Sequence, residues 1–341
     1  MSASTPAPPV GTQPAPNLSL DLEAAKSPPA TDPSLPPTKR PLHHRLLPRF
    51  PDAPPFRLWL RRSWLDILTQ LLCVLTAYLI YMFGRPLMPR LLPLFPGIER
   101  TPWGIKHGQP YMAEYVTTVV SAVVSFLGPF AVMGGVGLWM SARESRRGNA
   151  KGGDSWGFWD SNAATIGLGY ALATATLFQA LIKLTIGGLR PHFLALCNPH
   201  IPPHYRGAGP ASLYFPSGHA CAAFAGFGFL ALWLNGKCKI FGPQPQRGQQ
   251  IEDRNRGEER EGDREGEREG RKAHWKLVLF VAPLLLAVLL AASKVRDGWH
   301  HVSDVVAGAL VGSAFAVMAY RMVYRSVWDA RDNHVARERE E

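Results

Sequence analysis

The stretch VTTVVSAVVSFLGPFAVMGGVGLWM, residues 116–140, decides the fold class, because it contains no charged side chain over its whole length. A helix needs about 20 mostly apolar residues to cross the hydrocarbon core of a bilayer. Apolar and polar residues do not alternate strictly here, as they would in a transmembrane barrel strand, and a helix satisfies its own backbone hydrogen bonds in lipid. The stretch therefore predicts a transmembrane helix.

Outward from this stretch, further apolar segments are long enough, or nearly so, to span a membrane: residues 64–83, 165–182, 220–235, 277–292 and 305–320. The last three are short and need flanking residues to complete a span. Small residues that favour close helix packing recur in two spans: Gly134, Gly135 and Gly137 in the first stretch, and Gly308 and Gly312 in the last. We predict an all-α polytopic membrane protein with six transmembrane helices.

The overall composition hides this organisation. The chain has 341 residues, a formal net charge of +11 and a mean hydropathy of -0.05, an average that would suit a soluble protein. We predict a disordered Pro-rich cytosolic tail over residues 1–60, a six-helix membrane domain over 61–325 with a flexible charged insert at 243–273, and a polar C-terminal tail over 326–341. Four widely separated cysteines exclude a disulfide-built scaffold and a structural zinc site.

The distribution of Lys and Arg predicts the orientation in the membrane. Basic residues cluster before the first span, in loops two and four, and after the last span. The positive-inside rule puts these regions in the cytosol, so loops one, three and five face the exterior or an organelle lumen. Because a span follows the first cluster at once, we prefer this interpretation to nucleic-acid binding. Vacuole, endoplasmic reticulum and plasma membrane all stay open.

Unexpected polar residues collect in loops three and five, which share the non-cytosolic side. Loop three opens with KLTIGGLRP at the end of the third span and closes with FPSGHA before the fourth, and loop five contains SKVRDGWHHVSD. The candidate site residues are Lys183, Arg190, Ser217, Gly218, His219, Lys294, Arg296, His300 and Asp304. Because two crossings return the chain to the same face, we expect the three segments to converge.

These residue types point to phosphate chemistry. Cationic side chains can grip phosphate oxygens, and a helix that begins at Ser217 and Gly218 offers a hydroxyl and unpaired N–H groups to an anion. His300 and Asp304 are four residues apart, so the carboxylate can fix the imidazole tautomer and leave the other nitrogen as a nucleophile. His219 can protonate the departing oxygen as general acid. The set predicts phosphoryl transfer through a phosphohistidine.

In order and separation, segments 183–191, 216–219 and 293–304 resemble the three signature motifs of the type 2 phosphatidic acid phosphatase superfamily. Within it the chain is most similar to lipid phosphate phosphatases and fungal diacylglycerol pyrophosphate phosphatases, over about residues 60–325. The resemblance implies a hydrolase of phosphatidic acid, lysophosphatidic acid or diacylglycerol pyrophosphate, with a membrane phospholipid as substrate and no Mg²⁺ or other cofactor. It assigns phosphate binding to Lys183, Arg190, Ser217, Gly218 and the cation of the third motif, and catalysis to His219, His300 and Asp304.

The start of the third motif departs from the family pattern, because Ser293-Lys294 stands where Ser-Arg is usual. Lysine keeps the charge and loses the planar fork, and Arg296 can substitute if the loop turns it inward. A catalytically weakened phospholipid-binding relative therefore stays open, as does a polyprenyl pyrophosphate phosphatase. A transporter is disfavoured because the polar residues cluster at helix ends on one side.

Three neighbours of the motifs receive ordinary interpretations. We expect His192 to be an exposed loop residue, His301 to be structural or adjacent to substrate, and Trp299 to be an interfacial anchor. The oligomeric state is not predicted.

Overall fold

The computed structural model describes residues 54–84, 87, 95–146, 157–196, 215–241, 274–330 and 332–337. All of them belong to one compact unit, Arg49–Glu341. The predicted insert at 243–273 lies outside the described residues, and so does nearly all of the tail predicted over 1–60.

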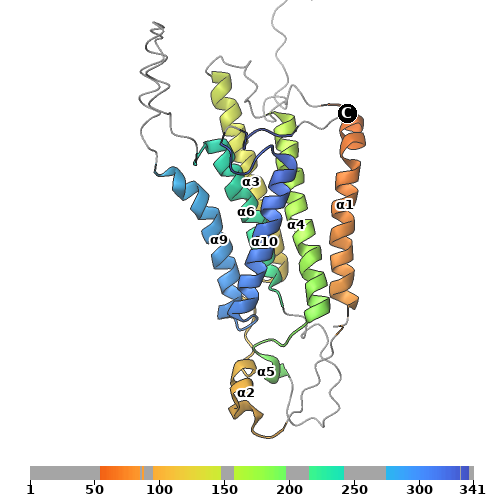
Figure 1. Ribbon diagram of the computed structural model, residues 1–341, viewed down its shortest axis with the longest axis vertical. Coiled ribbons are helices and arrows are strands. Elements are labelled where there is room, and N and C mark those ends of the chain that lie inside the picture. Colours follow the sequence, from red (N-terminus) through yellow and green to blue (C-terminus); the bar gives the residue numbers. More distant parts are fainter. Residues whose placement is uncertain are drawn as a thin grey trace, which may run out of the picture. The chain divides into compact units, whose positions relative to one another are not determined.

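Six long helices make up the described part of the chain (Figure 1). They are α1 (Phe56–Phe83), α3 (Thr118–Arg146), α4 (Phe158–Ile186), α6 (Gly218–Cys238), α9 (Lys276–Arg296) and α10 (Val302–Val323). Short helices η2 (Ile98–Arg100), α2 (Pro102–His107) and α5 (Phe193–Leu196) lie in the loops. All six long helices are long and apolar enough to cross a membrane, which confirms the all-α prediction and the six spans.

The last three spans are longer than the apolar segments from which they were predicted. Helices α6, α9 and α10 have 21, 21 and 22 residues, enough for a full crossing. The added residues include motif residues at one end of the bundle, namely Gly218, His219, Lys294 and Asp304. The apolar segments therefore end before the helices do, because the ends of these helices carry polar residues of the candidate site.

Helix α6 is the centre of the bundle. It contacts α3, α4, α9 and α10, while α1 packs against α4. Within the spanning stretch, 78% of α6 is buried, against 6% for α1. The outer helices expose Leu and Val side chains of the kind that suit a lipid environment. Alanine and glycine residues of α6 let its four neighbours approach closely, as is typical of helix packing in membranes.

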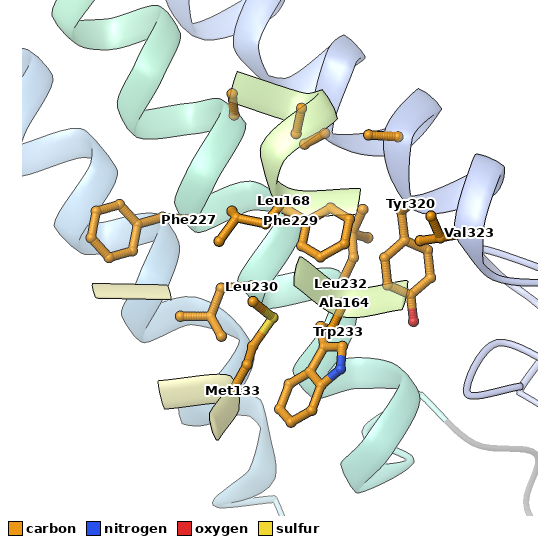
Figure 2. Packing of buried hydrophobic residues seen from close by; sticks show 14 of the residues in the cluster. Met133, Ala164, Leu168, Phe227, Phe229, Leu230, Leu232, Trp233, Tyr320 and Val323 are labelled. Atoms are coloured by element: carbon orange, nitrogen blue, oxygen red, sulfur yellow. The ribbon is translucent and has the colours of Figure 1, made fainter. Parts of the chain in front are cut away.

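The core between these helices is mostly aliphatic and aromatic (Figure 2). Leu168 of α4, Phe229 of α6 and Tyr320 of α10 all belong to it. The rings of Phe229 and Tyr320 meet edge to face with their centroids 5.5 Å apart, a geometry that aromatic pairs prefer. This core fixes the mutual positions of α4, α6 and α10, the three helices that carry Lys183, Gly218, His219 and Asp304.

Helices α6 and α10 touch through backbone at two glycines of α10. A Cβ atom at Gly308 would lie 2.4 Å from the Ser217 carbonyl oxygen, and one at Gly312 would lie 2.3 Å from the Cys221 carbonyl oxygen. The prediction that these glycines serve helix packing is confirmed. It is wrong for Gly134 and Gly135, because a Cβ atom at either would meet no described atom within 4 Å.

The described residues after α10 turn back along the end of the bundle. The amide of Arg325 donates to the Val335 carbonyl over 3.0 Å, and Tyr320 Oη donates to the Asn333 carbonyl. Val327 and Asn333 are buried. The part of the predicted polar tail that the structure describes is therefore packed against the helices.

The contact at Gly308 generates the first prediction. Gly308→Ala forces a methyl group against backbone that cannot move aside, so we expect the free energy of unfolding to fall by about 1–3 kcal/mol. Gly134→Ala is the matched control: it removes a helical glycine where space is free, and should leave stability unchanged or raise it by up to about 1 kcal/mol. Thermal unfolding of both variants in detergent measures the difference. Equal melting temperatures would contradict the predicted role of Gly308.

Candidate active site

The three motif segments meet at one end of the bundle, where α4 and α9 end and α6 and α10 begin (Figure 1). Two hydrogen bonds join them: the Ser217 amide donates to the Asp304 carbonyl over 3.0 Å, and His192 Nδ1 lies 2.9 Å from the Gly298 carbonyl oxygen. The site residues Lys183, Ser217, His219, Lys294, His300 and Asp304 are all buried. The structure thus brings together residues that are far apart in the sequence.

His300 and Asp304 lie side by side at the start of α10. His300 Nδ1 is 3.7 Å from Asp304 Oδ2. The same carboxylate accepts a bond of 2.8 Å from the His301 amide and one of 3.1 Å from Ser303 Oγ. Asp304 and His301 form a reciprocal capping box, so local helix chemistry fixes the carboxylate. His301 therefore has a structural role, one of the two roles expected for it.

The surroundings of His300 favour its neutral imidazole over the protonated form. Burial lowers the pKa of its imidazole well below the usual value, and Lys183, Arg190 and Lys294 lower this pKa further. A neutral imidazole retains a lone pair, which is the form required of a nucleophile. Nδ1 faces Asp304, so Nε2 is the ring nitrogen farther from this carboxylate.

The N-terminus of α6 contributes backbone donors. Ser217 is the N-cap, with its hydroxyl 3.5 Å from the Ala220 amide nitrogen, and Gly218 opens the helix. A Cβ atom at Gly218 would lie 3.6 Å from Lys183 Nζ, so the ammonium group lies at the helix start. Helix N-termini attract anions, and here a cation adds to that field.

Arg190 is held by an aromatic wall. Its guanidinium group lies 4.4 Å above the Trp299 ring, and Trp299 Nε1 donates to the Met112 carbonyl over 2.9 Å. The His192 ring packs edge-on against Trp299 and is buried. The expectation of an exposed His192 is therefore wrong. Trp299 orients a phosphate-binding candidate, a contact that interfacial anchoring does not describe.

Lys294 is fully buried and its charge is already balanced. Its ammonium group donates to the Val116 carbonyl over 2.5 Å and lies 3.6 Å from Glu114 Oε2 and 3.6 Å from Asp297 Oδ2. Asp297 Oδ2 also accepts a bond of 2.7 Å from the Tyr115 amide. Lys294 thus ties the segment before α3 to the end of α9.

Arg296 is placed differently from the other candidates. Its side chain is exposed, and its guanidinium group lies 5.0 Å from the centroid of the Tyr115 ring. The structure therefore does not bring Arg296 into the buried group around His300.

Residues 164–328 match the family described as the PAP2 superfamily. Over this stretch, just under half of the chain, the protein is similar to PAP2 superfamily domains. The match contains all of the motif residues, from Lys183 to Asp304, and spans α4 (except its first turns), α6, α9 and α10. The recognition made from the motifs is confirmed.

Curated relatives of this PAP2 domain carry lipid phosphatase names. The chain is 33% identical over 178 residues to lipid phosphate phosphatase 1 of Arabidopsis thaliana, covering 49% of this chain and 46% of the relative. It is 30% identical over 182 residues to a probable diacylglycerol pyrophosphate phosphatase 1 of Schizosaccharomyces pombe, covering 49% and 54%. The chain spans about half the length of the curated relatives it matches. No solved structure gives a significant match.

The sequence interpretation missed two polar residues beside the PAP2 motifs. Glu114 lies 3.6 Å from Lys294 Nζ and 4.0 Å from His219 Nε2. Gln179 lies one helical turn before Lys183, and its Oε1 atom would be 3.4 Å from a Cβ atom at Gly218. Two signals point to them: loop one shares its membrane side with loops three and five, and a spacing of four residues places Gln179 on the face of Lys183.

Within the described ranges, no group of three or more His, Cys, Asp or Glu side chains could hold a metal ion. The carboxylates near the motifs lie instead against cations and imidazoles. Metal independence stays a prediction.

Burial of Lys294 generates the second prediction. Lys294→Met leaves Glu114 and Asp297 without their shared cation, and breaking a buried ion pair costs roughly 3 kcal/mol or more. We expect a clear fall in the melting temperature in detergent. Arg296→Met is the matched control, because it removes an exposed cation from the same helix end and should change stability by less than about 0.5 kcal/mol. Similar losses in both variants would contradict a special role for Lys294.

Proposed function

We propose that this integral membrane protein is a lipid phosphatase that removes phosphate from phosphatidic acid, lysophosphatidic acid or diacylglycerol pyrophosphate. The single observation that carries the proposal is the buried pair of His300 and Asp304, whose Nδ1 and Oδ2 atoms lie 3.7 Å apart. Burial, and then the charges of Lys183 and Arg190, lower the pKa of this imidazole. The PAP2 domain and the names of the curated relatives support the choice of lipid substrates.

Phosphate binding would use the positive end of α6 together with two cations. The phosphate oxygens accept hydrogen bonds from the first amides of α6, from Lys183 Nζ and from Arg190. The Nε atom of Arg190 is buried and has no hydrogen-bond partner among the described residues, so it has a donor to offer. Trp299 holds the guanidinium plane while its N–H groups bind the anion.

The first chemical step transfers the phosphoryl group to the protein. His300 Nε2 attacks phosphorus, the bond from phosphorus to the lipid oxygen breaks, and the departing oxygen takes a proton from His219. His219 Nε2 is buried and makes no hydrogen bond to a described residue, which suits a proton donor to substrate. Asp304 stabilises the positive charge that develops on His300.

The second step returns the protein to its starting state. Water attacks phosphorus, the bond from His300 Nε2 to phosphorus breaks, and His219 accepts the proton that water loses. Inorganic phosphate then leaves. Charge stabilisation throughout falls to Lys183, Arg190 and the helix amides, so the proposed cycle uses no metal ion.

The site would open on the lumenal or extracellular side. It lies at the end of the bundle shared by loops one, three and five, while basic residues such as Lys237 and Arg321 cap the opposite ends of α6 and α10. The positive-inside rule assigns that basic end to the cytosol. Vacuole, endoplasmic reticulum and plasma membrane are all compatible with this orientation.

A second candidate function follows from Lys294. Because its ammonium group is already balanced by Glu114 and Asp297, it has little charge to offer to phosphate. A phospholipid-binding relative with weakened turnover fits this arrangement. This second function is favoured if the wild type binds lipid without turnover and the Lys294→Arg variant releases phosphate.

Phosphate release from phosphatidic acid in mixed detergent micelles tests the proposal, with EDTA present throughout. His300→Ala removes the nucleophile and should lower kcat by at least about 1,000-fold. His274→Ala is the matched control, because that exposed histidine precedes the other end of α9 and should leave kcat within about twofold. Absence of phosphate release by the wild type, or equal rates in wild type and His300→Ala, would overturn the proposed activity.

Competition among lipids identifies the substrate class. Phosphatidic acid, lysophosphatidic acid, diacylglycerol pyrophosphate and a polyprenyl pyrophosphate are presented in equal mole fractions, and each product is counted. A kcat/KM for the polyprenyl pyrophosphate that exceeds the others would select that alternative over glycerolipids.

A further inference from the structure

A carboxylate outside the matched domain reaches the reacting groups. Glu114 belongs to the segment between α2 and α3, and its side chain is only 16% exposed. Its Oε2 atom lies 4.0 Å from Nε2 of His219 and 3.6 Å from the ammonium group of Lys294. Glu114 lies outside the three motif segments, and the motifs do not predict an acidic residue at this point.

The backbone beside Glu114 is fixed on the neighbouring helix. The Tyr115 amide donates to Asp297 Oδ2 over 2.7 Å, and the Val116 carbonyl accepts from Lys294 Nζ. These bonds hold two consecutive residues against the end of α9. Glu114 is therefore positioned by its neighbours, and its carboxylate does not depend on substrate to reach the site.

The charges that face Glu114 come from three other parts of the chain. They are His219 of α6, Lys294 of α9 and Arg190 of the loop after α4. His219 itself faces the charges of Lys294 and Lys183 and the His300 ring. These cations disfavour a positive charge on the His219 imidazole. A general acid, however, must carry its proton when substrate is bound. Among the described carboxylates, Glu114 lies within ion-pair distance of His219, at 4.0 Å.

We propose that Glu114 is the positioning residue that keeps His219 protonated for the departing lipid oxygen, so that the site contains two histidine–carboxylate pairs. The inference rests on the proposed phosphatase activity. Asp304 lies beside Nδ1 of His300, the nucleophile, and Glu114 lies beside Nε2 of His219, the acid. An oxygen atom that bonds to Nε2 at about 2.8 Å can also lie within hydrogen-bond reach of Oε2 across a 4.0 Å gap.

The proton balance leaves Glu114 ionised throughout. In the first step the proton on His219 Nε2 passes to the lipid oxygen as the phosphorus–oxygen bond breaks. In the second step a proton of the attacking water passes to the same nitrogen as the phosphorus–nitrogen bond breaks. Glu114 exchanges no proton; its negative charge stabilises the imidazolium form before the first transfer and after the second.

The opposing interpretation is purely structural, with Glu114 serving only to neutralise Lys294. The two interpretations differ in pH dependence. If Glu114 stabilises the imidazolium form of His219, replacing its carboxylate with a neutral group makes His219 lose its proton at lower pH. The alkaline limb of the kcat profile then shifts to lower pH. If Glu114 only holds Lys294, kcat falls by the same factor at every pH.

The test measures kcat against pH for wild type, Glu114→Gln and Glu99→Gln in mixed micelles of phosphatidic acid. Glu99→Gln removes an exposed carboxylate from η2 and is the matched control. We expect the alkaline limb of Glu114→Gln to lie about one pH unit lower, as for loss of one charge near 4 Å, with KM within about threefold. Ionisation of the substrate is common to all three proteins and cancels in the comparison. An unmoved limb, with or without a uniform loss of kcat, overturns the inference.

Glu114→Asp keeps the test decisive if the Gln variant does not accumulate in membranes. It retains the charge and withdraws it by one methylene group, so the limb should move in the same direction by a fraction of a unit. An unmoved limb in this variant also overturns the inference. Failure of the phosphatase proposal is distinguishable, because it appears as absent wild-type turnover, whereas failure of this inference leaves wild-type turnover intact and the limb in place.

Discussion

The close approach of α6 to α10 is the contact on which the candidate site depends. At Gly308 and Gly312 the two helices meet backbone to backbone, with no room for a single methyl group between them. The Ser217 amide then bonds to the Asp304 carbonyl, so the first turns of both helices share one register. His219 lies on the first turn of α6, and His300 lies two residues before α10 begins. Gly308 and Gly312, about two and three helical turns beyond His300, therefore help to position both histidines.

Burial of so many ionisable groups requires that their charges balance. Three cations and three carboxylates surround the two histidines: Lys183, Arg190 and Lys294, and Glu114, Asp297 and Asp304. Each carboxylate touches either a cation or an imidazole, which lowers the cost of removing it from water. The cations differ in their hydrogen-bond partners. Lys294 lies among acceptors from the protein, whereas Arg190 stacks on an indole and its Nε donor has no partner among the described residues.

The sequence was most informative where one physical requirement dominates. Uncharged stretches predicted the spans because lipid tolerates few alternatives, and the loop topology predicted which motifs meet. It was least informative where tertiary contacts decide. His192 looked like a loop residue because its contacts to Trp299 and Gly298 come from another loop, and Glu114 carried no motif. Gly134 and Gly308 are indistinguishable as small residues in apolar spans, and only the neighbouring helix separates their roles.

The residues after α10 bear on how this protein can be labelled. The described residues of 324–330 and 332–337 pair with each other through Arg325 and Val335. Lys237 of α6 bonds to the His334 carbonyl, and Lys239, directly after α6, bonds to the Ala330 carbonyl. Asp160 of α4 joins the same group of contacts through Tyr324 and Lys237. A reporter enzyme or fluorescent protein attached after residue 337 leaves these contacts intact. One inserted a dozen residues earlier would break the bonds that link α4, α6 and the segment after α10. The reach of the packed fold thus sets the boundary for topology mapping by fusion.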